Sequence, residues 1–494
     1  MNFSSDQLLN RIEQLGNRLP HPTLMFIWLC GLVLVVSAVA AQTGLSAAHP
    51  ATGDTIAVMN LLSQTGVEKI LTGTVSNFTG FAPVGTVLVA MLGLGVAERS
   101  GLIGILLSGL VRKAKGHFLT FTVVFAGVMS SLAADAGYVV LIPLAALVFQ
   151  AAGRHPLAGI AAAFAGVSGG YSANLLLGPF DAVLSGISTE AARLIDPAAD
   201  VSIAANYWFM IVSVFLVSGL ATLVTARWVE PRLATLTIDE HAQTTRTSEE
   251  SNDAAGLKAV AAFTLIFILV LISGLSSEGA WLRQGSAMTG SPFMKGIVVV
   301  ISLYALLCGY IFGRVSGRWQ GGKDMIVAME SSMATMAGYL VLMFFAAQFV
   351  AYFSWSNIGI ILAVKGAGIL TAIEAPAVIL LVAFIFIAAF INLFVGSGSA
   401  KWALLAPVFV PMLMLTGISP EATQVAFRIG DSSTNIITPL MPYFGVVLAF
   451  AQQYRSDLGV GTIMSMMLPY SVAFLLGWSA LLVVWLLSGW PLGA

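Results

Sequence analysis

Two short polar stretches inside apolar sequence hold the residues with the most distinctive chemistry. The first, residues 129–137, contains Asp135, and the second, residues 396–402, contains Lys401. An apolar run with a proline follows each stretch, and a Gly- and Ser-containing segment comes next, which in the second copy includes Asp431. Matching polar segments interrupted by glycine in two halves of a chain point to the substrate site of a secondary transporter.

Oxygen ligands for a hard cation such as Na+ are concentrated at these breaks. An ionisable group inside a bilayer costs several kcal/mol, so Asp135 and Asp431 are predicted to bind the coupling ion, Na+ or H+. Asn392 is predicted to be a third ligand of a sodium site. The further candidates for ion coupling are the polar or glycine residues at or beside the breaks: Asp181, Ser130, Ser131, Gly137, Asn174, Ser399, Ser432 and Asn435.

Several of these residues also have structural interpretations. Buried Ser and Asn side chains often form hydrogen bonds between helices, and Asp181 could carry an ion or cap a helix near the surface. Arg428 lies three residues before Asp431 on the same helical face, so it either pairs with Asp431 or grips a substrate carboxylate. Trp402 could stack on an aromatic substrate or belong to an interfacial belt. Lys401 could contact an anion or extend to the surface.

Composition places most of the chain in a membrane. Of 494 residues, 58% are hydrophobic and 9% are charged, and the mean hydropathy is +0.92. Soluble globular proteins carry about 25% charged residues, so most of this chain must face lipid or a core buried in lipid. The net charge of −1 argues against a nucleic-acid partner. No histidine lies in an apolar segment and no phosphate-binding loop is present, which argues against an intramembrane enzyme and an ATP-driven pump.

Apolar segments and loop charge predict the topology. A spanning helix needs about 20 apolar residues, and short loops rich in Lys and Arg stay in the cytoplasm. The first segment, 23–42, follows a mostly polar stretch and is predicted to be a retained helix rather than a cleaved signal peptide. Segment 118–152 could form two spans or one re-entrant hairpin, and its arms of about 12 to 15 residues are short for a full crossing and favour the hairpin. Because the second half repeats the scheme, segment 377–416 is predicted to form a second hairpin. The neighbouring spans are expected to be interrupted at 166–172 and 430–435.

The predicted fold is an all-α polytopic membrane protein with nine transmembrane helices plus two re-entrant helical hairpins in inverted repeats. Pro143 and Pro156 are separated by 13 positions, as are Pro407 and Pro420. The first hairpin opens from the cytoplasm and the second from outside. The predicted parts are an N-terminal helix and external loop (1–80), a first repeat (81–226), a cytoplasmic linker (227–256), connecting transmembrane helices (257–334) and a second repeat (335–494).

The run Ala426–Phe444 strongly resembles the signature of the aminobenzoyl-glutamate transporter (AbgT) family, and Gly93–Glu98 and Asn392–Trp402 look similar to it too. The resemblance implies a homodimer in a bacterial inner membrane that transports p-aminobenzoyl-glutamate or related folate catabolites, with sodium bound. For some members it implies export of sulfonamide drugs. By motif match, the substrate and ion path would be lined by Asn392, Trp402, Pro420, Arg428 and Asp431, with Asp181 as the matching aspartate of the first half.

We therefore expect an ion-coupled secondary transporter that moves a small anionic aromatic substrate by alternating access and uses no organic cofactor. Arg428 would bind a carboxylate and Trp402 the ring. A sodium-coupled dicarboxylate transporter of the same broad architecture is the main alternative. An ion channel and a membrane hydrolase are further alternatives, although a hydrolase would lack an intramembrane base.

Overall fold

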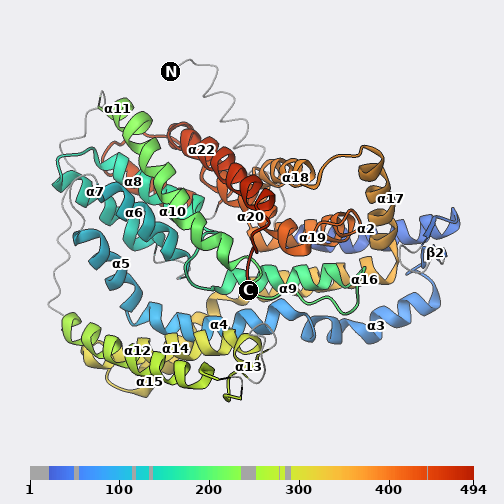
Figure 1. Cartoon of the computed structure of the whole chain (residues 1–494), viewed down its shortest axis with the longest axis horizontal. Helices are drawn as coiled ribbons and strands as arrows, with labels where there is room; N and C mark the ends of the chain where they lie inside the picture. The colour runs from blue at the N-terminus through green and yellow to red at the C-terminus, as the bar shows by residue number, and fades with distance from the viewer. Residues whose placement is uncertain are drawn as a thin grey trace.

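The structure is a computed structural model that describes residues 22–48, 55–113, 118–132, 137–234, 252–277, 279–283, 291–441 and 443–494. Helices make up 77% of the chain, which confirms the predicted all-α class. The strands in the described residues are β1 (Ser46–Ala48) and β2 (Thr55–Ala57), which pair antiparallel with Ser46 opposite Ala57. The sequence does not predict this small hairpin, which lies at one end of the molecule (Figure 1).

Helices of the first half precede the long polar stretch. They are α2 (Pro22–Gln42), α3 (Gln64–Thr79), α4 (Ala82–Arg99), α5 (Leu102–Lys113), α6 (Phe118–Met129), α7 (Ile142–Ala151), α8 (Pro156–Phe164), α9 (Pro179–Ala192), α10 (Tyr207–Val224) and α11 (Glu230–Leu233). Short 3-10 or π-helical segments adjoin them: η1 (Ser130–Leu132), η2 (Gly137–Leu141), η3 (Ala165–Gly169) and η4 (Thr225–Val229).

The second half of the chain begins after the long polar stretch. The elements of this half are α12 (Asp253–Leu275), α13 (Pro292–Lys295), α14 (Ile297–Val315), α15 (Gly322–Thr335), α16 (Ala337–Trp355), α17 (Ile358–Ala372), α18 (Ala377–Asn392), α19 (Gly398–Met414), α20 (Pro420–Thr434), η5 (Asn435–Ile437), α21 (Phe444–Gln452) and α22 (Val460–Leu487). Among the described residues, seven helical runs are long and apolar enough to span a membrane. The chain is therefore a multi-pass membrane protein.

The observed boundaries differ from the predicted ones in two ways. Both ends of the predicted linker 227–256 are helical, because η4 and α11 continue to Leu233 and α12 begins at Asp253. Residues 235–251, between these helices, lie outside the described residues. The sequence also does not predict α3, α15 or α17. The helix α3 contains Thr, Ser and Asn and has weak apolar character, but Ser63 Oγ caps it by accepting from Gly66 N at 3.2 Å.

Two helical hairpins and two interrupted helices form the centre of the fold. Hairpin 1 consists of α6–η1 and η2–α7, and hairpin 2 consists of α18 and α19. The helix α8 packs against both arms of hairpin 1, passes into η3 and loses helical form before α9. In the same way, α20 packs against both arms of hairpin 2 and ends in η5 before α21. The peripheral helices α12, α14 and α15 lie together beside α4 (Figure 1).

The second half of each interrupted helix packs against the hairpin of the other repeat or the helix beside it. The helix α9 continues from α8 but packs along α19 of hairpin 2, whereas α21 continues from α20 but packs against α7 and α8. The contacts are reciprocal, because Phe180 of α9 covers Gly398 of α19 and Tyr443 stacks on Tyr138 of η2 with ring centroids 4.3 Å apart. This reciprocity is what a pair of inverted repeats with exchanged arms would produce.

Small residues allow α18 and α20 to approach closely. Gly430 of α20 faces the backbone of α18, and a methyl group there would collide with the Ile385 carbonyl oxygen and lie 2.8 Å from Ala388 Cβ. Gly445 of α21 has nothing within 4 Å of the equivalent position. The contact that holds hairpin 2 against the interrupted helix therefore depends on the missing side chain at Gly430.

We expect Gly430→Ala to destabilise the protein and Gly445→Ala to leave it unchanged. Overpacking of a tight site costs about 1–3 kcal/mol, so the midpoint of thermal unfolding in detergent should fall for Gly430→Ala. Gly445, near the start of α21, is a matched control because the same methyl group is added there without a collision. Equal unfolding midpoints for the two variants would contradict this account of the packing.

Candidate functional site

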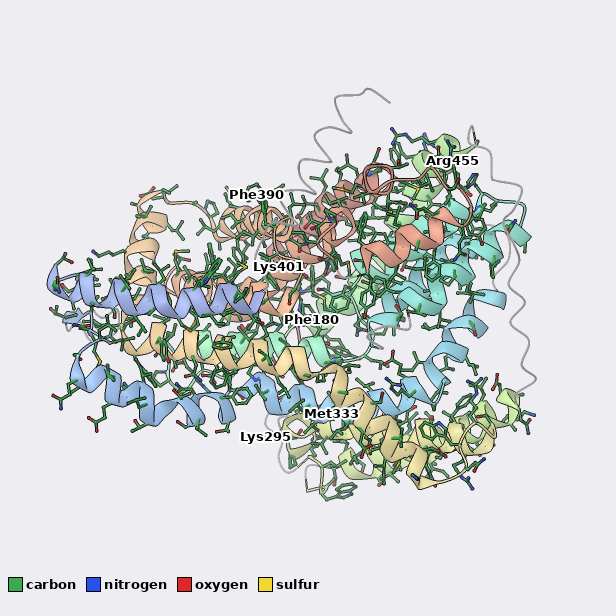
Figure 2. The ribbon with its side chains drawn as sticks, turned by 180° about the vertical axis from the view of Figure 1, so that it is seen from behind. Phe180, Lys295, Met333, Phe390, Lys401 and Arg455 are labelled. Carbon is green, nitrogen blue, oxygen red and sulfur yellow. The ribbon has the colours of Figure 1, made fainter. Side chains whose placement is uncertain are left out.

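Two helix N-termini meet at the centre of the molecule. The helix α9 begins at Pro179 and α19 begins at Gly398, and the ring of Phe180 packs over Gly398. The helices then run side by side, with Trp402 Nε1 donating to the Leu184 carbonyl oxygen at 3.2 Å. Figure 2, in which Phe180 is labelled, shows this region in the middle of the molecule. Because helix N-termini carry free amides and partial positive charge, the junction favours anions.

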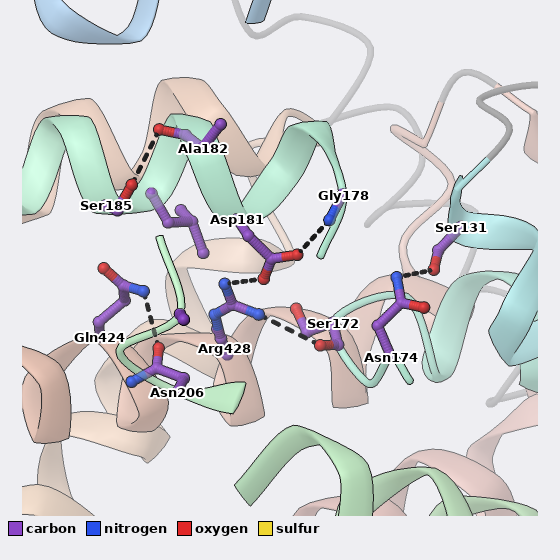
Figure 3. Close-up of polar contacts among 12 residues, drawn as sticks. Ser131, Ser172, Asn174, Gly178, Asp181, Ala182, Ser185, Asn206, Gln424 and Arg428 are labelled. Atoms are coloured by element: carbon purple, nitrogen blue, oxygen red, sulfur yellow. Dashed lines mark hydrogen bonds and ion pairs between the residues drawn. The ribbon is translucent and has the colours of Figure 1, made fainter. Parts of the chain in front are cut away.

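Arg428 of α20 forms a buried ion pair with Asp181 of α9. Arg428 is 1% exposed, and its Nη1 also donates to the carbonyl oxygen of Ser172 at 3.2 Å, in the non-helical segment between η3 and α9. The second carboxylate oxygen of Asp181 accepts from the backbone N–H of Gly178 at 2.7 Å and so caps α9. Arg428 therefore joins α20 to the break of the first interrupted helix (Figure 3).

Lys401, Asp431 and Asn392 form a second buried polar group. The Lys401 ammonium pairs with the carboxylate of Asp431 and donates to Oδ1 of Asn392. Nδ2 of Asn392 donates to the Asp431 carbonyl oxygen at 2.5 Å, to Thr434 Oγ1 at 2.8 Å and to Asn435 Oδ1 at 3.0 Å. Lys401 and Asp431 are each 1% exposed. The C-terminal ends of α18 and α20 thus converge on one ammonium group.

The polar residues of hairpin 1 lie beside the first break. Ser130 Oγ donates to the Gly127 carbonyl oxygen at 2.6 Å and lies against Gly137, so the two arms meet at this point. Asn174 Nδ2 donates to Ser131 Oγ at 3.0 Å and connects the hairpin to the segment before α9 (Figure 3). The bond between Asn174 and Ser131 joins two segments, as the structural interpretation of these residues expects, whereas the Ser130 hydroxyl bonds back to its own arm of the hairpin.

Apart from Asp431 Oδ1, which faces the Lys401 ammonium, four buried polar atoms in this region have no hydrogen-bond partner among the described residues: Arg428 Nε, Ser172 Oγ, Asn174 Oδ1 and Ser432 Oγ. Buried polar atoms without partners are uncommon in native proteins and call for an explanation. Three of the four belong to residues at the first break or to the arginine bonded to it. These four atoms can therefore form hydrogen bonds to a polar ligand without first losing a hydrogen bond to the protein.

The structure corrects the pairing expected for Arg428 and Lys401. The predicted alternative of an internal pair between Arg428 and Asp431 is wrong, because Arg428 pairs with Asp181 and Asp431 pairs with Lys401. The alternative that Lys401 extends to the surface is also wrong, because its side chain is buried. Asp181 caps a helix as one alternative expected, but that helix end is inside the protein rather than near its surface.

Trp402 is fully buried, so the expectation of an interfacial belt residue is wrong. Its ring lies against Phe427, with ring centroids 4.6 Å apart and planes inclined by 31°. Nε1 also donates to Ser188 Oγ at 3.0 Å. The indole is therefore held in a protein interior that already contains another aromatic ring.

The second interruption begins later than the sequence indicates. The predicted break at 430–435 is wrong, because α20 stays helical through Thr434 and irregular backbone follows η5. Ser433 Oγ donates to the Ile429 carbonyl oxygen at 2.6 Å and Thr434 Oγ1 to that of Gly430 at 2.9 Å, so these hydroxyl groups bond back to the helix instead of leaving it. Pro439 lies just beyond, where a helix cannot continue.

Three other predicted residues lie apart from the two ion pairs or outside the described residues. Pro420 is the first residue of α20 and lies eight positions, about 12 Å of helix, before Arg428. Its neighbours Ser419 and Glu421 line a cavity of about 810 Å³. Ser399 lies in the first turn of α19 and its hydroxyl contacts that of Ser397 at 3.3 Å. Asp135, a predicted sodium ligand, lies outside the described residues.

A chain of hydrogen bonds that the sequence analysis does not predict connects Trp402 to the start of α20. Ser188 Oγ, which accepts from Trp402, donates to Gln424 Oε1 at 2.6 Å. Gln424 Nε2 in turn donates to Asn206 Oδ1 at 2.7 Å (Figure 3). Asn206 Nδ2 then donates to the Glu421 carbonyl oxygen at 3.0 Å. A signal was present, because polar residues at 424, 428, 431 and 435 follow the helical spacing of one face.

Among the described residues, no group of three or more His, Cys, Asp or Glu side chains could hold a metal ion. A sodium ion at this site would instead use amide and carboxylate oxygens, of which Asn392 Oδ1 and the Asp431 carboxylate lie together. In the observed arrangement both are in contact with Lys401.

Interrupted helices, two hairpins and buried charges at their ends are features of membrane transporters. Comparison with known proteins agrees, because the model of the AbgT transporter family matches residues 7–494. The chain is 38% identical over 493 residues to the p-aminobenzoyl-glutamate transport protein of Escherichia coli (strain K12), covering 99% of this chain and 96% of that protein. The chain therefore belongs to the AbgT family of transporters, and it is not an enzyme.

Two solved structures resemble the whole molecule. The YdaH transporter of Alcanivorax borkumensis, described as having an unusual topology, has a TM-score of 0.92 and 55% identity and covers 96% of this chain and 100% of its own. MtrF of Neisseria gonorrhoeae, described as representing a class of antimetabolite efflux pumps, has a TM-score of 0.88 and 46% identity and covers 97% of each chain. These similarities confirm the family resemblance seen in the sequence motifs.

We expect Arg428→Met to destabilise the protein strongly and Arg428→Met/Asp181→Asn to recover much of the loss. The single change leaves Asp181 buried without its partner, which costs about 3–5 kcal/mol, whereas removing both charges leaves no unpaired ion. Thermal unfolding in detergent measures both variants. The exposed pair of Arg193 and Glu190 supplies a control, since Arg193→Met should cost no more than about 1 kcal/mol. A double variant no more stable than Arg428→Met would contradict the pairing.

Proposed function

We propose that the chain is an ion-coupled secondary transporter of p-aminobenzoyl-glutamate or related folate catabolites that works by alternating access between the two hairpins. The observation that carries the proposal is Arg428, a buried guanidinium whose Nε has no partner among the described residues, beside the N-terminus of α9. A guanidinium has forked donors that match a carboxylate. The E. coli relative, which is a p-aminobenzoyl-glutamate transport protein, supports this substrate class.

Aromatic side chains near Arg428 favour an aromatic substrate over the dicarboxylate alternative. The Phe180 ring centroid is 6.0 Å from Arg428 Cζ, and Tyr171 packs on Phe180 with centroids 5.0 Å apart. Trp402 and Phe427 form a second aromatic pair, and Phe427 is the residue before Arg428 in the chain. An aminobenzoyl ring can stack on such side chains, whereas a small aliphatic dicarboxylate has no group that would use them.

Coupling to an ion follows from the need to keep buried charges paired. If Arg428 turns its donors to a substrate carboxylate, Asp181 loses the partner that it has in this structure. A buried carboxylate without a partner is costly, and a proton or Na+ on Asp181 would offset that cost. The carboxylate of Asp431, with Asn392, is the second position where a coupling ion would bind. We therefore propose Na+ or H+ as the coupling ion.

The proposal extends to other cargo and to assembly. The similarity to MtrF, described among antimetabolite efflux pumps, supports export of sulfonamide drugs, which share the para-aminobenzoyl shape. We also propose that the protein is a homodimer in a bacterial inner membrane, as the family resemblance implies. The exposed apolar face of α12, with Leu265, Ile266 and Leu269, supports placement in lipid.

We expect purified protein in proteoliposomes to exchange labelled p-aminobenzoyl-glutamate across the membrane. Excess unlabelled p-aminobenzoyl-glutamate and a sulfonamide should compete, because both present the same ring, whereas succinate should not. Counterflow with Na+ and H+ gradients imposed separately would identify the coupling ion. Competition by succinate in the absence of any exchange of p-aminobenzoyl-glutamate would favour the dicarboxylate alternative instead.

We expect Arg428→Lys to raise the concentration for half-maximal counterflow about tenfold, because an ammonium group cannot form the bidentate, charge-assisted hydrogen bonds of a guanidinium. The change keeps the positive charge that Asp181 requires, so the protein should fold. Arg227→Lys, at an exposed position of η4, is a matched control and should transport normally. Unchanged substrate affinity in Arg428→Lys would argue against carboxylate binding by this residue.

A further inference from the structure

The ammonium group of Lys401 lies where a small cation would be expected to bind. It contacts Oδ1 of Asn392 and the carboxylate of Asp431, and these are oxygen ligands that a hard monovalent cation would use. The side chains of all three residues are almost completely buried. Lys401 is therefore enclosed in the protein and cannot be treated as a solvated surface charge.

Asn392 is oriented as an acceptor for a cation by contacts that do not involve Lys401. Its Nδ2 donates to oxygens of Asp431, Thr434 and Asn435 at 2.5 to 3.0 Å. Because the amide nitrogen is fixed in this way, the amide oxygen must point to the opposite side. Ser432, next to Asp431, adds a buried hydroxyl without a partner among the described residues. The oxygen ligands would thus stay in place if the ammonium left.

The position of Lys401 in its helix is unfavourable for a purely structural cation. It lies in the first turn of α19, where the helix dipole disfavours positive charge. On the other helices packed against α19, Asp181 is engaged with Arg428, Glu190 pairs with Arg193, and Lys365 is exposed. Asp431 is the carboxylate that offsets the ammonium.

We propose that Lys401 is a tethered cation that replaces sodium at Asp431 and Asn392, so that sodium binds there only in a conformation from which the ammonium has withdrawn. Either cation leaves the site neutral, whereas the absence of both leaves Asp431 unpaired in a medium of low dielectric. The inference deepens the proposed function and rests on it for its place in the transport cycle. The same two oxygens would then hold Lys401 in one conformation and sodium in another.

Binding of radioactive sodium to the purified full-length protein in detergent tests this inference at a single pH of about 8. Lys401→Met keeps a side chain of similar length without the charge, and we expect it to bind sodium at lower concentrations than the wild type, in which the ammonium must first withdraw. Lys401→Met/Asp431→Asn removes the carboxylate as well and should lose this tighter binding. Lys365→Met, on the exposed face of α17, is the control and should bind sodium as the wild type does.

Each result decides the matter. Equal sodium affinities of the wild type and of folded Lys401→Met would overturn the inference, and so would tighter sodium binding that persists in Lys401→Met/Asp431→Asn. A Lys401→Met protein that fails to fold in both sodium and choline chloride, while the double variant folds, would show that sodium cannot replace the ammonium and would also overturn it. Counterflow by the wild type is measured separately, so its absence would reject the proposed function and leave the binding result intact.

Discussion

Pairing of buried charge is the constraint on which the centre of this molecule depends. Arg428 and Lys401 are each about 1% exposed, and each has a carboxylate partner, Asp181 or Asp431. Removing one partner of such a pair costs about 3–5 kcal/mol, which is comparable to a large part of a protein's stability. Arg428 and Asp181 come from different halves of the chain, so this pair also fixes how α20 packs on α9.

The interruptions of the helices follow from the same constraint. A continuous apolar helix offers no free backbone groups, whereas a helix end provides amides or carbonyls that can share a buried charge. Asp181 caps α9 through the Gly178 N–H and pairs with Arg428, and Asn392 ends α18 by bonding to the last turn of α20. The exchanged arms bring these ends together, because α9 packs on α19 rather than beside its own hairpin.

Residue type was predictable from the sequence, but pairing was not. Asp431, Asn392 and Arg428 stand out because polar side chains in apolar segments need a reason, and the all-α class follows from composition. Partners depend on packing between distant segments, so the local spacing of Arg428 and Asp431 pointed to a pair that does not form. The start of the second break was also hidden, because the hydroxyls of Ser433 and Thr434 can continue a helix as readily as leave it.

Charge pairing and transport make opposite demands on the same residues, and the structure meets both by leaving some bonding capacity unused. A guanidinium fully saturated by protein groups could not accept a substrate without first losing a bond. Arg428 retains an unpartnered Nε among the described residues, beside Ser172 and Asn174, which also have unpartnered oxygens. A ligand carboxylate can therefore begin to interact before the Asp181 pair separates. The free energy gained in that first contact offsets part of the cost of separating Arg428 from Asp181. If the two carboxylates exchanged in a single step, this cost would not be offset in advance.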